Sequence, residues 1–536
     1  MPALSVLDLA MFLLETPQRP FNIGPLVILD PPARGRATFA DRLRTQMLKR
    51  PPGVPFNYRL HMPLLGMPSL EPDPDARLAE HVHRVTLDAP GSNEQLFAKV
   101  CEYHEAVLDR SRLLWNLYII DGLEGGKVAV YATTHHGIID GRGFVEAIAN
   151  WLSTSPTDPA VRALWEGVPR RANEGAIRAS LRTRLSGLLG KASGSGASVL
   201  GLYGMFVQQG LKTLGVGSAG LSLPYTGVPS VLRGTSSARR SFAYTTLPLQ
   251  AMKAFGKAHG ATLNDVVLLS LDIALARYLD DLGKRPKRAL VTAMPVALTG
   301  AKGGNQIAVL QFPLGAPGHG IDERLAAIRK ETTNVKSVLE KESADTVMLY
   351  TTLVHGLPAL MERAGRKRGL PLSNLMVSNP FGFPEKRYLM GALVETVLPV
   401  SVVPAGQMLN VTAVSLGDLM QLGFLGMPET VPDIGKLALY TAQACNDVLR
   451  LDAKDKAAKA GGPVDSGSVV PASAAARRPA AKRPAATPPP AKTRAARSSK
   501  AKLAEAKPLA ARRSSAKHPA PKRAATGKTA RGEPRA

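Results

Sequence analysis

The chain of 536 residues contains only two cysteines, Cys101 and Cys445. Two cysteines cannot supply a disulfide framework, which favours a reducing compartment. No uncharged apolar run reaches the roughly 18 residues that a spanning helix needs, and the N-terminus has no basic region followed by an apolar core and a cleavage site. The sequence therefore predicts a cytoplasmic protein without a membrane-spanning helix or secretory signal.

Positive charge dominates, and most of it lies at the C-terminus. The formal net charge is +26, and residues 453–536 hold 21 basic against four acidic residues, a net +17 that leaves +9 for residues 1–452. This segment is rich in Ala, Lys, Arg, Pro and Ser, so we expect a disordered tail. It would attract polyanions. Because the tail has no aromatic residues to stack on bases, nonspecific attraction to a membrane or nucleic acid is favoured over dedicated nucleic-acid recognition.

The remaining residues are too many for one typical domain, which predicts two cores. We divide the chain into an N-terminal lobe (1–165), an interlobe crossover (166–235), a C-terminal lobe (236–452) and the tail (453–536). Ser92 and Gln95 predict a helix start, and Thr262 with Asp265 predicts another. Periodicity predicts these further elements: strands over 115–120, 128–134 and 289–296, and helices over 262–279 and 433–449.

The crossover differs from its surroundings in charge. Residues 170–219 hold seven Lys or Arg and one acid, Glu174. Ile177, Leu181, Leu185 and Leu188 recur at helical spacing, which is typical of a basic amphipathic helix that lies on an anionic membrane. A crossover packed against the protein explains the pattern equally well. Val199–Leu214 predicts a second, apolar helix.

The segment from Thr133 to Gly141, sequence TTHHGIIDG, carries the strongest chemical signal. Alternation along the preceding strand places His135 and His136 on opposite faces. After Asp140 the apolar spacing becomes helical, so the segment lies at a strand-to-helix corner, where Gly141 and Gly143 would permit a tight turn.

Three interpretations of this corner compete. A metal site requires convergent ligands, which histidines on opposite faces do not provide, and His136 with Asp140 is too few protein ligands for zinc; we therefore expect no metal. A structural pair would bond its rings to nearby backbone. A general base is the third interpretation, since an imidazole titrates near neutral pH and can accept an alcohol proton. Spacing alone leaves the structural and catalytic interpretations open.

A resemblance covering about residues 4–451 bears on this choice. The histidine segment and its surroundings resemble the bacterial wax ester synthase/diacylglycerol acyltransferase family, within the superfamily of CoA-dependent acyltransferases with the HHxxxDG motif. Further elements resemble family motifs in the same order: Leu4-Ser5-Val6-Leu7-Asp8 with Phe12, Glu15 and Pro20-Phe21-Asn22-Ile23-Gly24; Leu108-Asp109-Arg110 through Trp115; Asn264-Asp265; Gly304-Asn305; Val377-Ser378-Asn379-Pro380 with Gly391-Ala392; and Val431-Pro432-Asp433.

The resemblance implies an α/β fold with two chloramphenicol-acetyltransferase-like lobes, mixed sheets flanked by helices, and an active-site tunnel between the lobes. It implies that His136 is the general base that deprotonates an acceptor hydroxyl, which then attacks the acyl-CoA thioester without a covalent enzyme intermediate or a cofactor. His135 and Gly141 would support the base. Asp140 would anchor the turn, most simply by pairing with an arginine.

The resemblance also implies the substrates and the surroundings of the site. The acceptor would be diacylglycerol, giving triacylglycerol, or a long-chain alcohol, giving a wax ester. Asn264, Asp265, Ser378, Asn379 and Trp115 would bind substrate or lie beside the site. The enzyme would lie at the inner face of the membrane or on lipid inclusions. Two alternatives are a catalytically weak paralogue that binds lipid surfaces or polyanions through its basic segments, and a condensation domain, although no carrier domain follows.

Local signals give some of these residues a purely structural interpretation. Thr262 and Asp265 suit a helix cap, which makes Asn264 the better candidate of that pair to reach the site. Trp115 suits a hydrophobic core, and Ser378-Asn379-Pro380 suits a turn. The chain also departs from the family pattern at six further positions, which bear on acceptor choice and activity rather than fold: Asn22, Leu113, Leu416, Met427, and Phe381 with Phe383.

Overall fold

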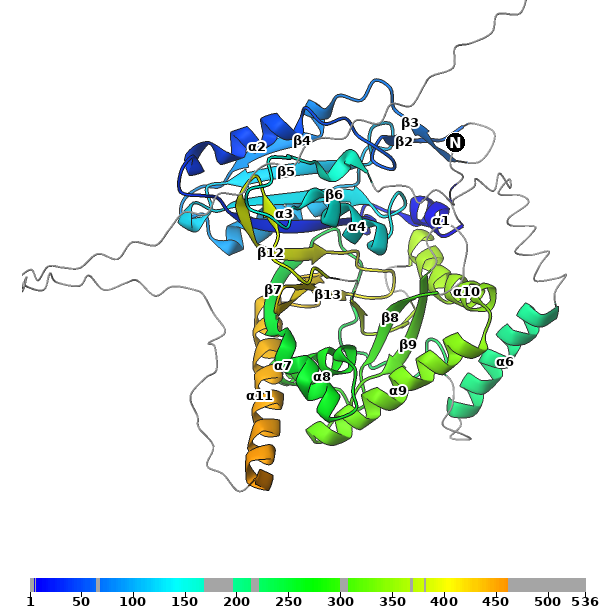
Figure 1. Cartoon of the computed structure of the whole chain (residues 1–536). Coiled ribbons are helices and arrows are strands. Elements are labelled where there is room, and N and C mark those ends of the chain that lie inside the picture. Colours follow the sequence, from blue (N-terminus) through cyan, green and yellow to red (C-terminus); the bar gives the residue numbers. More distant parts are fainter. Residues whose placement is uncertain are drawn as a thin grey trace, which may run out of the picture. The chain divides into compact units, whose positions relative to one another are not determined.

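The computed structural model describes residues 4, 6–63, 68–167, 196–213, 221–298, 307–366, 370–379 and 382–460. These residues belong to one compact unit and build two six-stranded sheets with flanking helices (Figure 1). The predicted basic helix over 177–188, the Gly304-Asn305 element, Phe381 and tail residues 461–536 lie outside the described residues.

The first sheet has the strand order β11-β12-β1-β6-β5-β4. Its strands are β1 (Asn22–Asp30), β4 (Val82–Thr86), β5 (Trp115–Asp121), β6 (Val128–His135), β11 (Tyr388–Leu389) and β12 (Ala392–Val400). Strands β6 and β12 pair antiparallel with the two sides of β1. Residues 388–400 therefore complete the sheet of the first lobe, although our division assigned them to the second.

Helices α1 (Val6–Leu14), α2 (Phe39–Met47), α3 (Asn93–Glu105) and α4 (Gly141–Trp151) accompany this sheet, and β2 (Tyr58–His61) and β3 (Ser69–Pro72) pair separately. All eight residues of β6 are buried. Ala129 and Tyr131 belong to one hydrophobic core and Val128, Val130 and Ala132 to another. The predicted alternation of faces is thus confirmed, with a core on each side of the strand.

The second sheet has the order β7-β14-β13-β10-β8-β9, with β8, β10 and β13 parallel to one another. Its strands are β7 (Ser241–Pro248), β8 (Val291–Ala297), β9 (Ile307–Pro313), β10 (Leu375–Ser378), β13 (Leu409–Leu416) and β14 (Leu419–Gly426). Helix α11 packs against α8 and β7, and α9 and α10 contact β9. The helices of this part are α6 (Gly196–Thr213), α7 (Leu249–Ala258), α8 (Leu263–Asp281), α9 (Ile321–Lys341), α10 (Ala344–Arg363) and α11 (Ile434–Ala460).

Both predicted helix starts are confirmed, because Ser92 with Gln95 and Thr262 with Asp265 form reciprocal capping boxes. Helix α6 confirms the apolar helix expected after residue 199. Helix α11 continues to Ala460, so residues 453–460 of the expected tail are helical. Within the described ranges, no single helix has the length and hydropathy to cross a membrane. Helices α7 and α8 have that length and hydropathy only when taken together, and the pair is bent by 102°.

Candidate active site

The two histidines lie where β6 ends. His135 is the last residue of β6 and pairs with Asn22 at the start of β1. The amide of His135 donates to the Leu114 carbonyl at 2.9 Å, and the amide of His136 donates to the Phe21 carbonyl at 2.8 Å. Hydrogen bonds to segments on both sides thus fix the backbone of this corner.

His135 is a neutral, fully buried side chain. Its ring stacks on Phe12 with centroids 4.0 Å apart, and its Nδ1 accepts a hydrogen bond from the Gly137 amide at 3.0 Å. Burial, with smaller contributions from Arg110 and His136, lowers the pKa of His135 to about 3. The ring proton is therefore on Nε2, which lies 3.6 Å from Glu15 Oε1. This contact joins a neutral imidazole to a carboxylate and is not an ion pair.

Glu15 connects the histidine corner to two other segments. One carboxylate oxygen accepts from the Phe21 amide at 2.9 Å, and the other accepts from Arg110 at 3.0 Å. Glu15 is buried, so Arg110 supplies the opposite charge that a buried carboxylate needs. Periodicity gave no reason to bring these residues together, although both stand in the elements that carry the family resemblance.

His136 differs from His135 in its surroundings. It is half-buried, and its Nδ1 is enclosed, with no hydrogen-bond partner in the described part of the chain. Its neighbour His135, by contrast, is held by Phe12 and Gly137. The two rings therefore have different surroundings, and the expectation that they serve different functions stays a prediction.

Asp140 anchors the corner as the N-cap of α4. Its side chain accepts a hydrogen bond from the Gly143 amide at 2.6 Å. Among the described residues no arginine pairs with Asp140, and its carboxylate is held by the helix amide instead. A Cβ at Gly141 would meet no atom within 4 Å, so no close approach requires glycine at that position. A Cβ at Gly137 would lie 2.6 Å from Phe12, so the close approach occurs at Gly137.

Removing this cap should weaken the corner without abolishing the fold. We expect Asp140→Ala to lower the free energy of unfolding by about 1 kcal/mol, the usual contribution of an N-cap side chain. Asp140→Asn, which can still accept the Gly143 hydrogen bond, should stay within a few tenths of a kcal/mol of the wild type. Urea unfolding of both variants tests this; equal losses would show that the charge and not the cap stabilises the corner.

Trp115 belongs to the core, as its local pattern suggested. It is 2% exposed, stacks on Trp165 at 4.9 Å and donates to the Phe56 carbonyl at 2.7 Å. Trp115 pairs with Thr134 of β6. It therefore supports the strand that ends in the histidines.

The candidates in the second half divide into a structural residue and a polar pair. Asp265 is buried, caps α8 and accepts from Thr332 of α9 at 2.8 Å. Asn379, just after Ser378 at the end of β10, donates to Asn264 at 2.6 Å. Asn264 and Asn379, 115 residues apart in sequence, are therefore brought together as candidate site residues.

Two departures from the family pattern pack against each other. Phe383 and Leu416 are both buried in the core of the first sheet and are joined by a β-bridge. The Phe383 amide donates to the Ser415 carbonyl at 2.7 Å. At least this part of the interrupted motif is thus accommodated as packing.

The described residues also bear on a metal site and on a cavity at the predicted site. Among the described residues, no cluster of three or more His, Cys, Asp or Glu could hold a metal ion. A cavity of about 630 Å³ is lined by residues 230–237, Lys284, Arg285, Glu429 and Thr430, and none of the predicted site residues lines it. The tunnel between the lobes stays a prediction.

Family models match both parts of the chain. Residues 4–267 match the wax ester synthase/diacylglycerol acyltransferase catalytic domain, and residues 303–448 match the C-terminal domain of that family. A probable diacylglycerol O-acyltransferase of Mycobacterium tuberculosis, Tgs4, is 30% identical over 84% of this chain and 96% of its own. A putative diacylglycerol O-acyltransferase of Mycobacterium bovis is 31% identical over 84% of this chain and 99% of its own.

Solved structures agree on the fold. The wax ester synthase/diacylglycerol acyltransferase from Marinobacter aquaeolei VT8 superposes with a TM-score of 0.62 at 24% identity, covering 84% of this chain and 99% of that one. The first condensation domain of the CDA synthetase gives 0.50 at 16% identity, covering 84% and 95%. The predicted two-lobed acyltransferase fold is confirmed, and the chain belongs to the wax ester synthase/diacylglycerol acyltransferase family of acyltransferases.

Proposed function

We propose that this enzyme transfers a long-chain acyl group from acyl-CoA to diacylglycerol or to a long-chain alcohol. The names of the mycobacterial relatives support diacylglycerol as the acceptor, and the family description includes wax ester synthesis. The observation that carries the proposal is the difference between the two histidines: one is buried and held neutral, and the other is half-buried with Nδ1 unpartnered by any described residue.

In the proposed mechanism His136 removes the proton of the acceptor hydroxyl. The alkoxide attacks the thioester carbonyl, the tetrahedral oxyanion collapses, and the departing CoA thiolate recovers the proton from the imidazolium. His135, which stays neutral, adds no positive charge beside His136. No covalent enzyme intermediate and no cofactor is required. Asn264 and Asn379 are proposed to contact substrate, whereas Asp140 and Trp115 keep the corner in place.

The water-insoluble acceptor and product favour an enzyme that works at a lipid surface. We propose attachment to the inner face of the membrane or to lipid inclusions through basic residues, six between 170 and 191 and 21 in the tail, against five acids in the two segments together. Lys212 is not counted, because it pairs with Glu331 of α9. Basic residues near an anionic surface each contribute about 1 kcal/mol. Nonspecific contact of the tail with nucleic acid would follow from the same charge.

The direct test uses purified full-length protein and palmitoyl-CoA. One arm contains diacylglycerol and another a long-chain alcohol, with ester and free CoA thiol measured in parallel. The proposal expects equal amounts of ester and thiol, and the faster arm identifies the preferred acceptor. Thiol release without ester in either arm would show a thioesterase and overturn the proposal.

A further inference from the structure

A buried ion pair joins the segment before β1 to helix α10 of the second half. Arg19 Nε lies 2.5 Å from one oxygen of Glu362, and Arg19 Nη2 lies 3.1 Å from the other. The two side chains are 5% and 9% exposed. Glu362 also accepts from the Gly406 amide at 3.0 Å. This is a bidentate, charge-assisted contact, which constrains the orientation of the arginine as well as its position.

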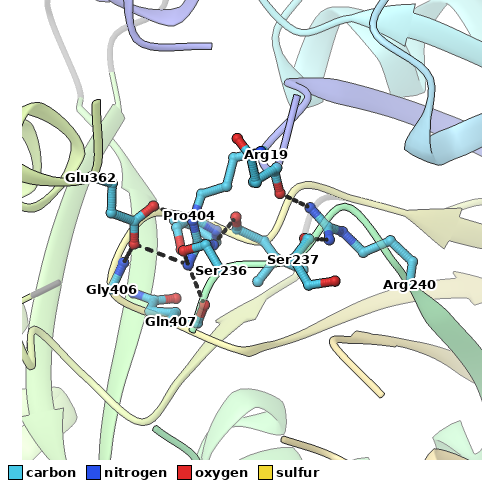
Figure 2. Close-up of polar contacts among 10 residues, drawn as sticks. Arg19, Ser236, Ser237, Arg240, Glu362, Pro404, Gly406 and Gln407 are labelled. Carbon is cyan, nitrogen blue, oxygen red and sulfur yellow. Dashed lines mark hydrogen bonds and ion pairs between the residues drawn. The ribbon is translucent and has the colours of Figure 1, made fainter. Parts of the chain in front are cut away.

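The rest of the Arg19 guanidinium is satisfied by the same part of the molecule. Figure 2 shows it beside Glu362 and the loop that contains Pro404 and Gln407. Its further acceptors are the carbonyls of Val403, Pro404 and Gln407, at 2.7, 2.6 and 3.1 Å, and the Ser236 hydroxyl at 3.0 Å. Burial lowers the pKa of Arg19, and Glu362 opposes this effect. Glu362 is thus the countercharge that lets a cation remain inside this junction.

The segment that Arg19 anchors is also the one that holds the histidines. Phe12 stacks on His135, Glu15 approaches its Nε2, and the Phe21 carbonyl accepts from the His136 amide. Arg19 lies between Glu15 and Phe21, in a turn closed by its own amide bonding to the Thr16 carbonyl at 2.9 Å.

Helix α10 holds this segment at a second point. Arg363, next to Glu362, donates to the Glu15 carbonyl at 3.3 Å. A displacement of the 12–21 segment would therefore move contacts of both histidines.

We infer that Glu362 is a positioning residue for acyl transfer: by holding Arg19 it fixes the 12–21 segment and, through that segment, the His135–His136 corner. The inference rests on the proposed role of His136. Misplacement of a catalytic group by about 1 Å can cost on the order of 100-fold in rate. Glu362 touches no reacting atom in this scheme, so its loss should reduce turnover and leave substrate affinity nearly unchanged.

The test substitution is Glu362→Gln, which keeps the shape and an acceptor for the Gly406 amide but removes the countercharge. Steady-state kinetics with palmitoyl-CoA and acceptor should show kcat lowered ~10- to 100-fold, with either KM changed less than about threefold. Arg19→Lys keeps the charge but loses the planar bidentate geometry. Its kcat should therefore lie between those of the wild type and Glu362→Gln.

Glu395→Gln is the control. Glu395 of β12 pairs at 2.6 Å with Lys127, the residue before β6, and both side chains are partly exposed. The substitution removes a carboxylate from an ion pair at the end of β6 away from His135, without touching the 12–21 segment. Its kcat should stay within about twofold of the wild type.

A neutral double variant, Arg19→Gln with Glu362→Gln, separates positioning from stability. Removing both charges leaves no unpaired buried ion, so thermal stability should recover relative to Glu362→Gln, whereas kcat should stay low. Recovery of kcat along with stability would overturn the inference, as would a Glu362→Gln enzyme with wild-type kcat. If His136→Ala is inactive while Glu362→Gln is fully active, this inference alone fails; if His136→Ala is fully active, the proposed mechanism fails first.

Discussion

His136→Ala should lower kcat for ester formation by at least ~100-fold, since a positioned general base commonly contributes that much or more. The proton of the acceptor hydroxyl would then have to leave to water. His135 cannot replace the lost base, because burial lowers its pKa to about 3, which makes it a weak base, and its Nδ1 already accepts the Gly137 amide.

The fold should survive this substitution, since His136 is only half-buried. Circular dichroism and thermal unfolding should match the wild type within a few degrees. His61→Ala, an exposed histidine on β2, is the matched control and should retain full activity. An unchanged kcat in His136→Ala would exclude the imidazole as the base.

Acidification from pH 7 to 4.5 should destabilise the folded chain by several kcal/mol, because the buried His104 and His135 and the half-buried His355 must stay neutral in the native state. Burial lowers the pKa of His104 and His135 to about 3 and of His355 to about 4. The unfolded chain binds protons near pH 6.5, so between pH 6.5 and 4 it binds more protons than the native state. Stability is therefore full above pH 6.5 and is lost as pH falls.

At 1.36 kcal/mol per pKa unit, each histidine contributes about 2 to 3 kcal/mol of this loss at pH 4.5. Asp272 acts in the opposite direction: burial raises its pKa to about 6, so it binds a proton more readily in the folded state and stabilises that state as pH falls below 6. One carboxyl offsets only part of the effect of three histidines.

Urea unfolding at pH 7 and pH 4.5 measures this difference. His104→Gln should reduce it by about 2 kcal/mol, since the variant lacks one of the groups that titrate on unfolding. His104 bonds to Tyr131 and to the Ser401 carbonyl, so the variant will also be less stable at pH 7. The test is therefore the loss in the free energy of unfolding between pH 7 and pH 4.5. The same loss in His104→Gln and in the wild type would contradict the assignment.

Features encoded by a few neighbouring residues could be predicted from the sequence. The caps at Ser92 and Thr262 use residues three positions apart, and the faces of β6 follow from strand alternation. The corner after His136 was likewise found from a change of period. In each case the controlling interactions are local, so periodicity and side-chain chemistry were sufficient.

Contacts between distant segments could not be predicted in this way. Arg19 and Glu362 are separated by 343 positions, and the passage of β12 into the first sheet depends on tertiary packing rather than on strand propensity. The steric role of Gly137, in the turn after β6, depends on Phe12 of helix α1. The sequence also did not indicate that the Asp140 carboxylate would accept the Gly143 amide at the start of α4.

The pH dependence of ester formation tests the central claim most directly, namely that the His136 imidazole takes the proton of the acceptor hydroxyl. The measured quantity is kcat/KM for the acceptor from pH 5 to 9, at saturating acyl-CoA, in wild type and His136→Ala. The two profiles should differ in shape, because only the wild type contains the proposed base. The variant should be slow across the whole range. Two profiles of the same shape would contradict the claim.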